Sequence, residues 1–278
     1  MSGLHRLVYA DIVTRALAED LAQGDRTTGS IFDGDEQAKA QIEARQRGVI
    51  AGMDVAREVF SQVDKGVTFI PVVKDGEPVT PGTVLARLGG PVTGILTGER
   101  LALNFLQRMS GIATSTRSAV ELVQGTKAQI TDTRKTVPGL RVLDKYAVRV
   151  GGGENHRFNL SDMVLIKDNH IKGAGSITEA VSRVRRHCGF PVKIEVEVAN
   201  LEEVREALDC QVDIIMLDNM DSSLMTQAVS DIAGRAQVEA SGGITQERLQ
   251  EVARTGVDYI SLGYLTGGSQ TLDISLNL

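Results

Sequence analysis

The distribution of apolar and polar residues divides this chain into two patterns, of which the second is the more regular. From residue 129 onward, short apolar runs alternate with segments that carry apolar residues at helical spacing. These features predict strands at 129–133, 163–167, 192–198, 213–218, 237–241 and 258–262, and helices at 139–150, 176–187, 201–209, 222–233 and 245–255. Such alternation indicates a parallel sheet, which right-handed crossovers would close into a barrel or leave open.

The first part of the chain has the pattern of a small β-rich domain. A helix and a loop are expected before residue 35, and a long helix from 95 to about 123. Between them, apolar–polar alternation predicts strands at 38–44, 67–73 and 83–88, with a helix at 54–63. The tail at 272–276 also alternates, and we expect it to return to this domain as a last strand.

Composition narrows the class of protein. The 278 residues are 42% hydrophobic and 24% charged, which is ordinary for a globular protein. The net charge of −6 argues against nucleic acid as a partner. No apolar run is long enough to span a membrane, so we expect a cytoplasmic protein. Cys188 and Cys210 lack the spacing of metal ligands and are interpreted as free thiols.

Positive charge is concentrated in residues 131–172, which hold eight Lys or Arg residues against five Asp or Glu residues. Arg134 and Lys135 follow one predicted strand, and Lys167 follows the next. His156 and Arg157 lie on a glycine-rich loop between those strands. Functional groups of parallel α/β folds gather at the carboxyl ends of strands. These cations are therefore expected to converge on one pocket that binds anions.

The predicted strand 192–198 is chemically unusual, because Lys193, Glu195 and Glu197 alternate with aliphatic residues. Parallel strands are normally apolar on both faces. Either this is an edge strand with a wet face, or the three charges point into a barrel and require partners, a metal or a ligand. Asp218 ends the next strand and would lie beside Glu197 if the two strands are neighbours.

Two glycine-containing strand ends suggest phosphate binding. The strand 237–241 runs into Ser241-Gly242-Gly243, and a helix is predicted from Thr245. Backbone N–H groups of such turns bind phosphate, although the same residues are also common in loops that bind no ligand. Gly263 follows the next strand, and phosphate sites after the last strands are common in barrels.

Several segments resemble one known family. Within residues 131–172, the chain reads TDTRKTVPGLR, then AVRVGGGENHR, then VLIKDNH. These motifs are similar to those of the quinolinate phosphoribosyltransferases, the carboxylating nicotinate-nucleotide pyrophosphorylases. The earlier segments EDLAQGDRTT and GERLALN also resemble segments of that family.

The resemblance implies an α/β protein with an incomplete parallel barrel, which fits the six predicted strands. On this basis we predict an α+β N-terminal sandwich domain at 1–112, joined by strand 270–278, and a catalytic barrel at 113–269. The implied reaction transfers a phosphoribosyl group from 5-phosphoribosyl-1-pyrophosphate to quinolinate with decarboxylation. It would give nicotinate mononucleotide, pyrophosphate and CO₂, as a pentosyltransferase of de novo NAD biosynthesis that uses Mg²⁺ and acts as a homodimer.

The resemblance also implies roles for individual residues. Quinolinate would be bound by Arg100 from the partner subunit, Thr133, Arg134, His156, Arg157 and Lys167. The phosphoribosyl donor would be bound by Lys135, Glu197, Asp218, Ser241, Gly242, Gly243, Gly263 and Tyr264. Lys135, Glu197 and Asp218 are the expected catalytic residues, and the two carboxylates would hold Mg²⁺ through the substrate. Gly267 stands where many relatives have histidine, which puts one phosphate contact in doubt.

Three other functions fit part of the pattern. A phosphoribosyltransferase of the same fold could use a different acceptor, as the paralogue found with molybdate transporters does. A Schiff-base lyase would use Lys167 or Lys193, but it would require a desolvated lysine apart from other cations. A non-catalytic module for anions would not explain Glu197 and Asp218.

Overall fold

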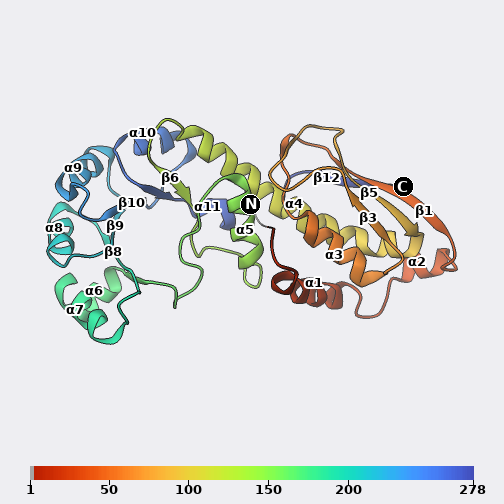
Figure 1. Cartoon of the computed structure of the whole chain (residues 1–278), viewed down its shortest axis with the longest axis horizontal. Coiled ribbons are helices and arrows are strands. Elements are labelled where there is room, and N and C mark those ends of the chain that lie inside the picture. Colours follow the sequence, from red (N-terminus) through yellow and green to blue (C-terminus); the bar gives the residue numbers. More distant parts are fainter. Residues whose placement is uncertain (1–2) are drawn as a thin grey trace. The chain divides into compact units, whose positions relative to one another are not determined.

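The structure is a computed structural model that describes residues 3–278, and it contains two compact units (Figure 1). The first unit comprises residues 3–117, 136–152 and 264–278, and the second comprises 118–135 and 153–263. The expected fold class, an α/β protein with an α+β N-terminal domain and an incomplete parallel barrel, is confirmed, and the structure contains one antiparallel and one parallel main sheet. In the described part of the chain, no helix has both the length and the apolar character needed to cross a membrane.

The first unit is built on an antiparallel sheet with the order β12-β1-β5-β3. Its strands are β12 (Ile274–Asn277), β1 (Gln37–Ala44), β5 (Val84–Pro91) and β3 (Thr68–Pro71). A separate pair joins β2 (Gly48–Val49) to β4 (Pro78–Val79). The predicted return of the C-terminal tail is therefore observed, because Ile42 of β1 pairs with Leu276 of β12.

The helices of the first unit include the predicted ones and two short ones that the pattern did not predict. They are α1 (Arg6–Asp20), α2 (Arg26–Ile31), α3 (Met53–Val63), most of α4 (Val92–Leu122), α5 (Arg141–Gly151) and α11 (Tyr264–Gly267). Asp25 caps α2, where it accepts hydrogen bonds from the backbone nitrogen of Thr28 at 2.9 Å and from its hydroxyl group. The motif EDLAQGDRTT thus contains a helix N-terminus.

The unit boundaries differ from the predicted domain boundaries. The predicted division at residues 112 and 113 falls inside α4, and α5 belongs to the first unit. The contacts of α5 explain why this helix belongs to the first unit. Arg108 of α4 donates two hydrogen bonds to the buried carboxylate of Asp144, at 2.9 and 2.8 Å. Tyr146 donates from its hydroxyl group to Asp75 at 2.8 Å, and burial raises the pKa of this phenol, as does the charge of Asp75.

The second unit contains a six-stranded sheet with the order β6-β11-β10-β9-β8-β7, in which every pair is parallel. The strands are β6 (Gln129–Thr131), β7 (Val164–Ile166), β8 (Ile194–Val198), β9 (Ile214–Asp218), β10 (Gln237–Ser241) and β11 (Tyr259–Ser261). All six correspond to predicted strands. The sheet order gives no pairing between β6 and β7, as expected for an incomplete barrel.

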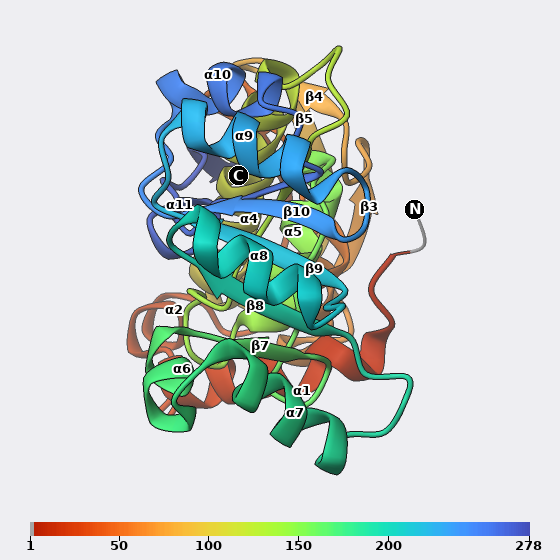
Figure 2. The same ribbon diagram turned by 90° about the vertical axis from the view of Figure 1, so that its left-hand side faces the viewer.

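Helices follow the strands of the second unit and cover the outer face of its sheet (Figure 2). They are α6 (Asp168–Ala174), α7 (Ile177–His187), α8 (Leu201–Asp209), α9 (Ser222–Ile232) and α10 (Leu249–Arg254), which follows a 3₁₀ turn at Gln246–Arg248. Side chains of Ser176, Asn200 and Asp221 cap α7, α8 and α9 by accepting hydrogen bonds from the first turn. The unpredicted helix α6 buries none of its side chains, so it lacks the apolar periodicity that identifies a helix.

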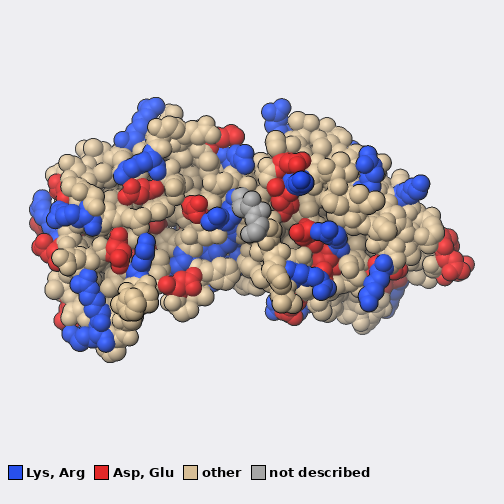
Figure 3. All heavy atoms as spheres, in the orientation of Figure 1, with Lys and Arg blue, Asp and Glu red and all other residues tan. Residues whose placement is uncertain are grey.

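The segment after α5 continues the sheet beyond β6. Glu154 forms a parallel bridge with Thr131, and its backbone nitrogen donates to the carbonyl of Ile130 at 2.8 Å. The glycine-rich loop is therefore attached to a strand edge, and this attachment places His156 and Arg157 beside the end of β6. On the face of the molecule shown in Figure 3, Lys and Arg are interspersed with Asp and Glu.

Candidate active site

Most of the residues expected in the site follow the carboxyl ends of the six parallel strands. Thr133, Arg134 and Lys135 come after β6, and Lys167 directly follows β7. Glu197 lies near the end of β8, Asp218 and Ser241 end β9 and β10, and Gly263 comes after β11. In a parallel sheet these ends share one edge. The register pairs Ser241 with Asp218 and Glu197 with Met216, so both carboxylates lie on neighbouring strands.

Arg134 and Arg157 place two positive charges near each other in half-buried positions. Burial lowers the pKa of Arg157, and the charge of Arg134 lowers it further. The Nε atom of Arg134 is buried and makes no hydrogen bond to the described part of the chain. Arg157 donates from Nη1 to the carbonyl of Met163 at 3.2 Å. Two guanidinium groups held this way favour a planar ligand with more than one carboxylate.

Lys167 and Glu197 form an ion pair between the ends of β7 and β8. The side chain of Lys167 is 43% exposed and that of Glu197 is 15% exposed. The sequence had assigned these residues to different substrates, whereas the structure brings their charged groups into contact. Lys193, for which an inward and a solvent-facing position had both been considered, lies before β8, is exposed, and donates to Gln237 at 3.4 Å.

The glycines of the expected phosphate site are favoured by their backbone conformation, and one of them also by a close approach of a side chain. Gly242 and Gly243 have positive φ angles of 89° and 56°. A Cβ atom on Gly242 would lie 2.5 Å from Cγ of Asn219. Asn219 is itself left-handed, with φ of 54°, and donates to Asp218 at 2.7 Å. The loops after β9 and β10 therefore pack closely, which holds Asp218 near the glycine turn.

Gly263 and Lys135 meet at the ends of β11 and β6. A Cβ atom on Gly263 would lie only 2.9 Å from Cδ of Lys135, so glycine leaves room for the lysine side chain. Thr133 orders the same loop, because its hydroxyl oxygen accepts a hydrogen bond from the backbone nitrogen of Lys135 at 3.0 Å. Two residues expected to bind the phosphoribosyl donor are thus brought together.

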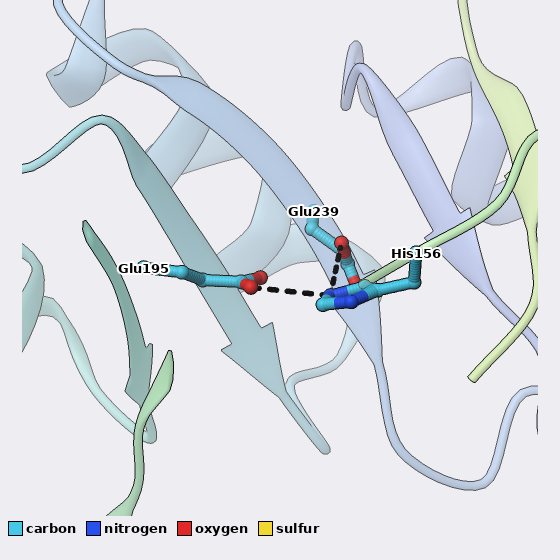
Figure 4. Close-up of side chains that lie close together, drawn as sticks. All are labelled: His156, Glu195 and Glu239. Carbon is cyan, nitrogen blue, oxygen red and sulfur yellow. Dashed lines mark ion pairs between the residues drawn. The ribbon is translucent and has the colours of Figure 1, made fainter. Parts of the chain in front are cut away.

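A buried cluster of three ionisable side chains lies in the interior of the sheet (Figure 4). Glu195 projects from β8 and Glu239 from β10 toward the ring of His156. Atom Nε2 of His156 is 3.1 Å from Oε2 of Glu195 and 3.5 Å from Oε2 of Glu239. Burial raises the pKa of Glu239 to about 8, with a further rise from the charge of Glu195 and an opposing effect of His156. The raised pKa favours a protonated Glu239 at neutral pH.

Asp132 fixes the loop that carries His156. Its carboxylate is fully buried, and it accepts hydrogen bonds from the backbone nitrogen of His156 at 2.9 Å and from the amide of Asn155 at 2.6 Å. Asp132 lies in the same motif as Arg134, yet the sequence suggested no role for it. Glu195 had been noted only as a charge on an unusual strand, and Glu239 had no assigned role. Charged residues at interior positions of parallel strands were the signal for both.

Two expected residues belong to the first unit. Arg100 is exposed on α4, and Tyr264 begins α11, which also contains Gly267. Neither residue therefore lies at a strand end of the second unit. Their expected roles in substrate binding stay predictions.

Comparison with known proteins identifies the family. Residues 25–110 and 112–277 match the N-terminal and C-terminal domains of quinolinate phosphoribosyl transferase. A probable nicotinate-nucleotide pyrophosphorylase [carboxylating] of Bacillus subtilis is 45% identical over 275 residues, which cover 99% of this chain and 95% of that protein. The chloroplastic enzyme of Arabidopsis thaliana is 40% identical over 96% of this chain and 82% of that protein.

Solved structures agree with this result. The crystal structure of NadC from Streptococcus pyogenes has a TM-score of 0.97 and 43% identity, and covers 100% of this chain and 98% of that one. The nicotinate-nucleotide pyrophosphorylase of Francisella tularensis has a TM-score of 0.92 and 39% identity over 99% and 97%. Both domains are thus shared with proteins of one kind, and this chain belongs to the quinolinate phosphoribosyltransferase family.

Proposed function

We propose that this chain transfers the phosphoribosyl group of 5-phosphoribosyl-1-pyrophosphate to quinolinate and releases pyrophosphate and CO₂, which yields nicotinate mononucleotide for NAD biosynthesis. The relatives at 45% identity are named as probable carboxylating nicotinate-nucleotide pyrophosphorylases, which supports this activity. The structural observation that carries it is the half-buried pair Arg134 and Arg157 at the carboxyl edge of a parallel sheet.

Quinolinate is a planar dianion, and the arginine pair suits it. Each guanidinium group can donate two parallel hydrogen bonds to a carboxylate. Binding a dianion would also relieve the repulsion between the two cations, which lowers the pKa of Arg157 in addition to the larger effect of burial. Lys167 adds a third positive charge at the next strand end, where Glu197 already holds its Nζ.

The phosphoribosyl donor would occupy the neighbouring strand ends. Lys135, the turn Ser241-Gly242-Gly243 and Gly263 offer a cation, backbone N–H groups and room for a closely approaching phosphate. The binding of anionic ligands alone would not explain the presence of carboxylates at these strand ends. Glu197 and Asp218 have a reason to lie there if positive charge develops on the ribose as pyrophosphate leaves.

The reaction can then be assigned to named groups. The lone pair of the pyridine nitrogen forms a bond to the ribose C1 as the bond from C1 to pyrophosphate breaks. The ring nitrogen becomes cationic and accepts electron density when the bond to the 2-carboxylate breaks. A proton then replaces CO₂ on the ring. Arg134 and Arg157 orient the ring, and Glu197 with Asp218 stabilises the ribose cation.

Mg²⁺ fits the oxygen donors of this site. Mg²⁺ usually keeps several waters and binds through one or two carboxylates together with substrate phosphates. Asp218 is half-buried and ends a strand beside the glycine turn, whereas Glu197 is engaged by Lys167. Asp218 would therefore be the main protein ligand, with Glu197 nearby. When bound, the ion would neutralise charge on the leaving pyrophosphate.

We also propose that the active form is a homodimer in which Arg100 reaches the quinolinate of the partner subunit. Arg100 is exposed on α4 in the first unit, and its segment GERLALN resembles the family segment with that role. An exposed arginine on a regular helix can project to a neighbouring chain without disturbing its own fold. Mixing an Arg100→Ala subunit with an Arg134→Ala subunit should restore activity if each dimer then contains one intact site.

The decisive experiment is detection of nicotinate mononucleotide by mass spectrometry after incubation with quinolinate, phosphoribosyl pyrophosphate and Mg²⁺. Pyrophosphate release with nicotinate or another planar base, and none with quinolinate, would favour a phosphoribosyltransferase with a different acceptor. Product formation that requires quinolinate and stops when the donor is omitted would establish the proposed reaction.

A further inference from the structure

The ring of His156 is engaged at both nitrogen atoms. Nδ1 accepts a hydrogen bond from the backbone nitrogen of Arg157 at 2.7 Å. Nε2 lies within 3.1 Å of Glu195 and 3.5 Å of Glu239. Because Nδ1 is an acceptor, a neutral ring carries its proton on Nε2, the atom that lies close to both carboxylates. His156 had been expected to bind quinolinate directly, and in the structure both of its ring nitrogens have protein neighbours.

Two carboxylates buried this deeply are costly to the fold. Glu195 is 0% exposed and Glu239 is 3% exposed. Both oxygens of Glu195 and Oε1 of Glu239 lack an aligned hydrogen bond in the described part of the chain. Replacing buried charged groups with apolar residues of similar size is often neutral or stabilising. Stability alone therefore does not account for these two side chains in the interior of the sheet.

His156 is linked to Arg157 by a hydrogen bond. The ring holds the backbone nitrogen of Arg157, and Asp132 holds the backbone nitrogen of His156. The negative charge of Glu195 also acts on the Arg157 guanidinium, since it raises the pKa of this group against the effects of burial and Arg134. Glu195 thus acts on Arg157 both through the histidine ring and through its charge.

We infer that Glu195 and Glu239 are positioning residues for the acceptor substrate, which act through His156 to hold Arg157 at the strand ends. His156 is then a positioning residue as well. The inference rests on the proposed function only in taking Arg157 as a ligand of the acceptor. The geometry of the three buried side chains carries the rest.

The first test examines the unmodified protein and requires no activity. Nitrogen-15 labelling of histidine gives signals from His5, His156, His170 and His187, and the His156→Gln variant identifies the signal that is lost. At neutral pH we expect Nδ1 of His156 to lack a proton and Nε2 to carry one. An imidazolium ion, or a proton on Nδ1, would contradict the hydrogen bond from Arg157 and overturn the inference.

The second test uses Glu195→Gln and Glu239→Gln, which keep the size of each side chain. Misplacing a binding group by about 1 Å can cost about 100-fold in rate. We expect the KM for quinolinate to rise about 10- to 100-fold, with the KM for phosphoribosyl pyrophosphate changed less than about twofold. Unchanged kinetics, or equal rises of both KM values, would contradict a role specific to the acceptor. Glu251→Gln, exposed on α10, is the matched control and should match the parent.

Metal analysis of the purified protein distinguishes a positioning role of these three side chains from a role as structural metal ligands. The ligand atoms of His156, Glu195 and Glu239 lie within 4.8 Å of one another, close enough to hold an ion. We expect no stoichiometric transition metal in the purified protein. One equivalent of metal that is lost in both glutamine variants would overturn the positioning role. Failure of the proposed reaction is separate, because a parent that makes no nicotinate mononucleotide could still show the Nε2–H ring.

Discussion

Lys167 and Glu197 contact each other across neighbouring strands, so the cation expected to bind quinolinate lies directly beside a carboxylate expected to serve the ribose. The ion pair joins the two regions where the substrates are expected to bind. In the proposed reaction, Glu197 would stabilise the ribose cation in the presence of the positive charge of Lys167. The balance of charge at this strand end therefore depends on both residues.

Loss of either expected catalytic carboxylate should affect turnover more than substrate binding. Glu197→Gln and Asp218→Asn are expected to lower kcat by about 10²–10³-fold, because a well-placed electrostatic group acts mainly in the transition state. Quinolinate affinity, measured by calorimetry without the donor, should change less than about threefold. If both variants turn over at the parental rate, the carboxylates do not stabilise a ribose cation.

Removal of either half-buried arginine should weaken quinolinate binding. Hydrogen bonds to charged groups contribute about 1.5–3 kcal/mol, so Arg134→Ala and Arg157→Ala should each weaken quinolinate binding about 10- to 150-fold. Arg205→Ala removes an exposed arginine on α8 and serves as the control. Calorimetry on folded proteins measures the effect, and an unchanged affinity in both variants would exclude the arginines as ligands.

Alanine substitutions should show that the glycine turn of the expected phosphate site is conformationally constrained, unlike a glycine elsewhere in the fold. Gly242→Ala places a Cβ atom 2.5 Å from Asn219 at a φ of 89°, and should raise the KM for phosphoribosyl pyrophosphate and lower the melting temperature. Gly173→Ala, on α6 with no atom within 4 Å, should stabilise the protein by up to about 1 kcal/mol. Equal behaviour of the two variants would show that the turn is not constrained.

Borohydride should not trap a covalent intermediate. Imine formation requires an uncharged amine that can attack a carbonyl group, and Nζ of Lys167 is held by Glu197. Intact mass after incubation with substrates and borohydride is expected to equal the mass of the untreated protein. A substrate adduct mapped to Lys167 would instead support the Schiff-base lyase.

The buried Glu239 should make stability depend on pH. Its pKa is about 8 in the folded protein and about 4.5 as the ordinary value, so the folded state binds more protons between these pH values. Stability is then lost as pH rises from about 4.5 through 8, by up to about 1.4 kcal/mol per pH unit. His156, Glu195 and Lys167 also act on this group. Glu239→Gln should flatten the decline in denaturant midpoints between pH 6 and 8, and parallel curves would contradict the raised pKa.

The parallel sheet was predictable because its signal is local. Each strand of the second unit is a short apolar run between polar clusters. Such a run predicts a strand regardless of which other strands it pairs with. The strand ends then indicated where Arg134, Lys135 and Lys167 would meet, since parallel strands end at one edge. Helix α6 was missed because none of its side chains is buried.

The interior cluster was not predictable because its geometry depends on pairing between distant segments. Glu195, Glu239 and His156 come from two strands and a loop, and only the sheet order with the attachment of Glu154 to β6 brings them together. Alternation had allowed Glu195 to face either the interior or the solvent, and no local pattern identifies its partner. The same limit applies to α5, whose place in the first unit depends on Asp75 and Arg108.

The pairing of β12 with β1 has a consequence for biosynthesis of the chain. Strand β12 follows the entire second unit in the sequence, yet it forms an edge of the sheet in the first unit. As the ribosome releases the chain from its N-terminus, β1 emerges early and lacks this neighbour until residues 274–277 appear. The nascent first unit therefore exposes an open sheet edge throughout synthesis of the second, which is the period when a chaperone would protect it from aggregation.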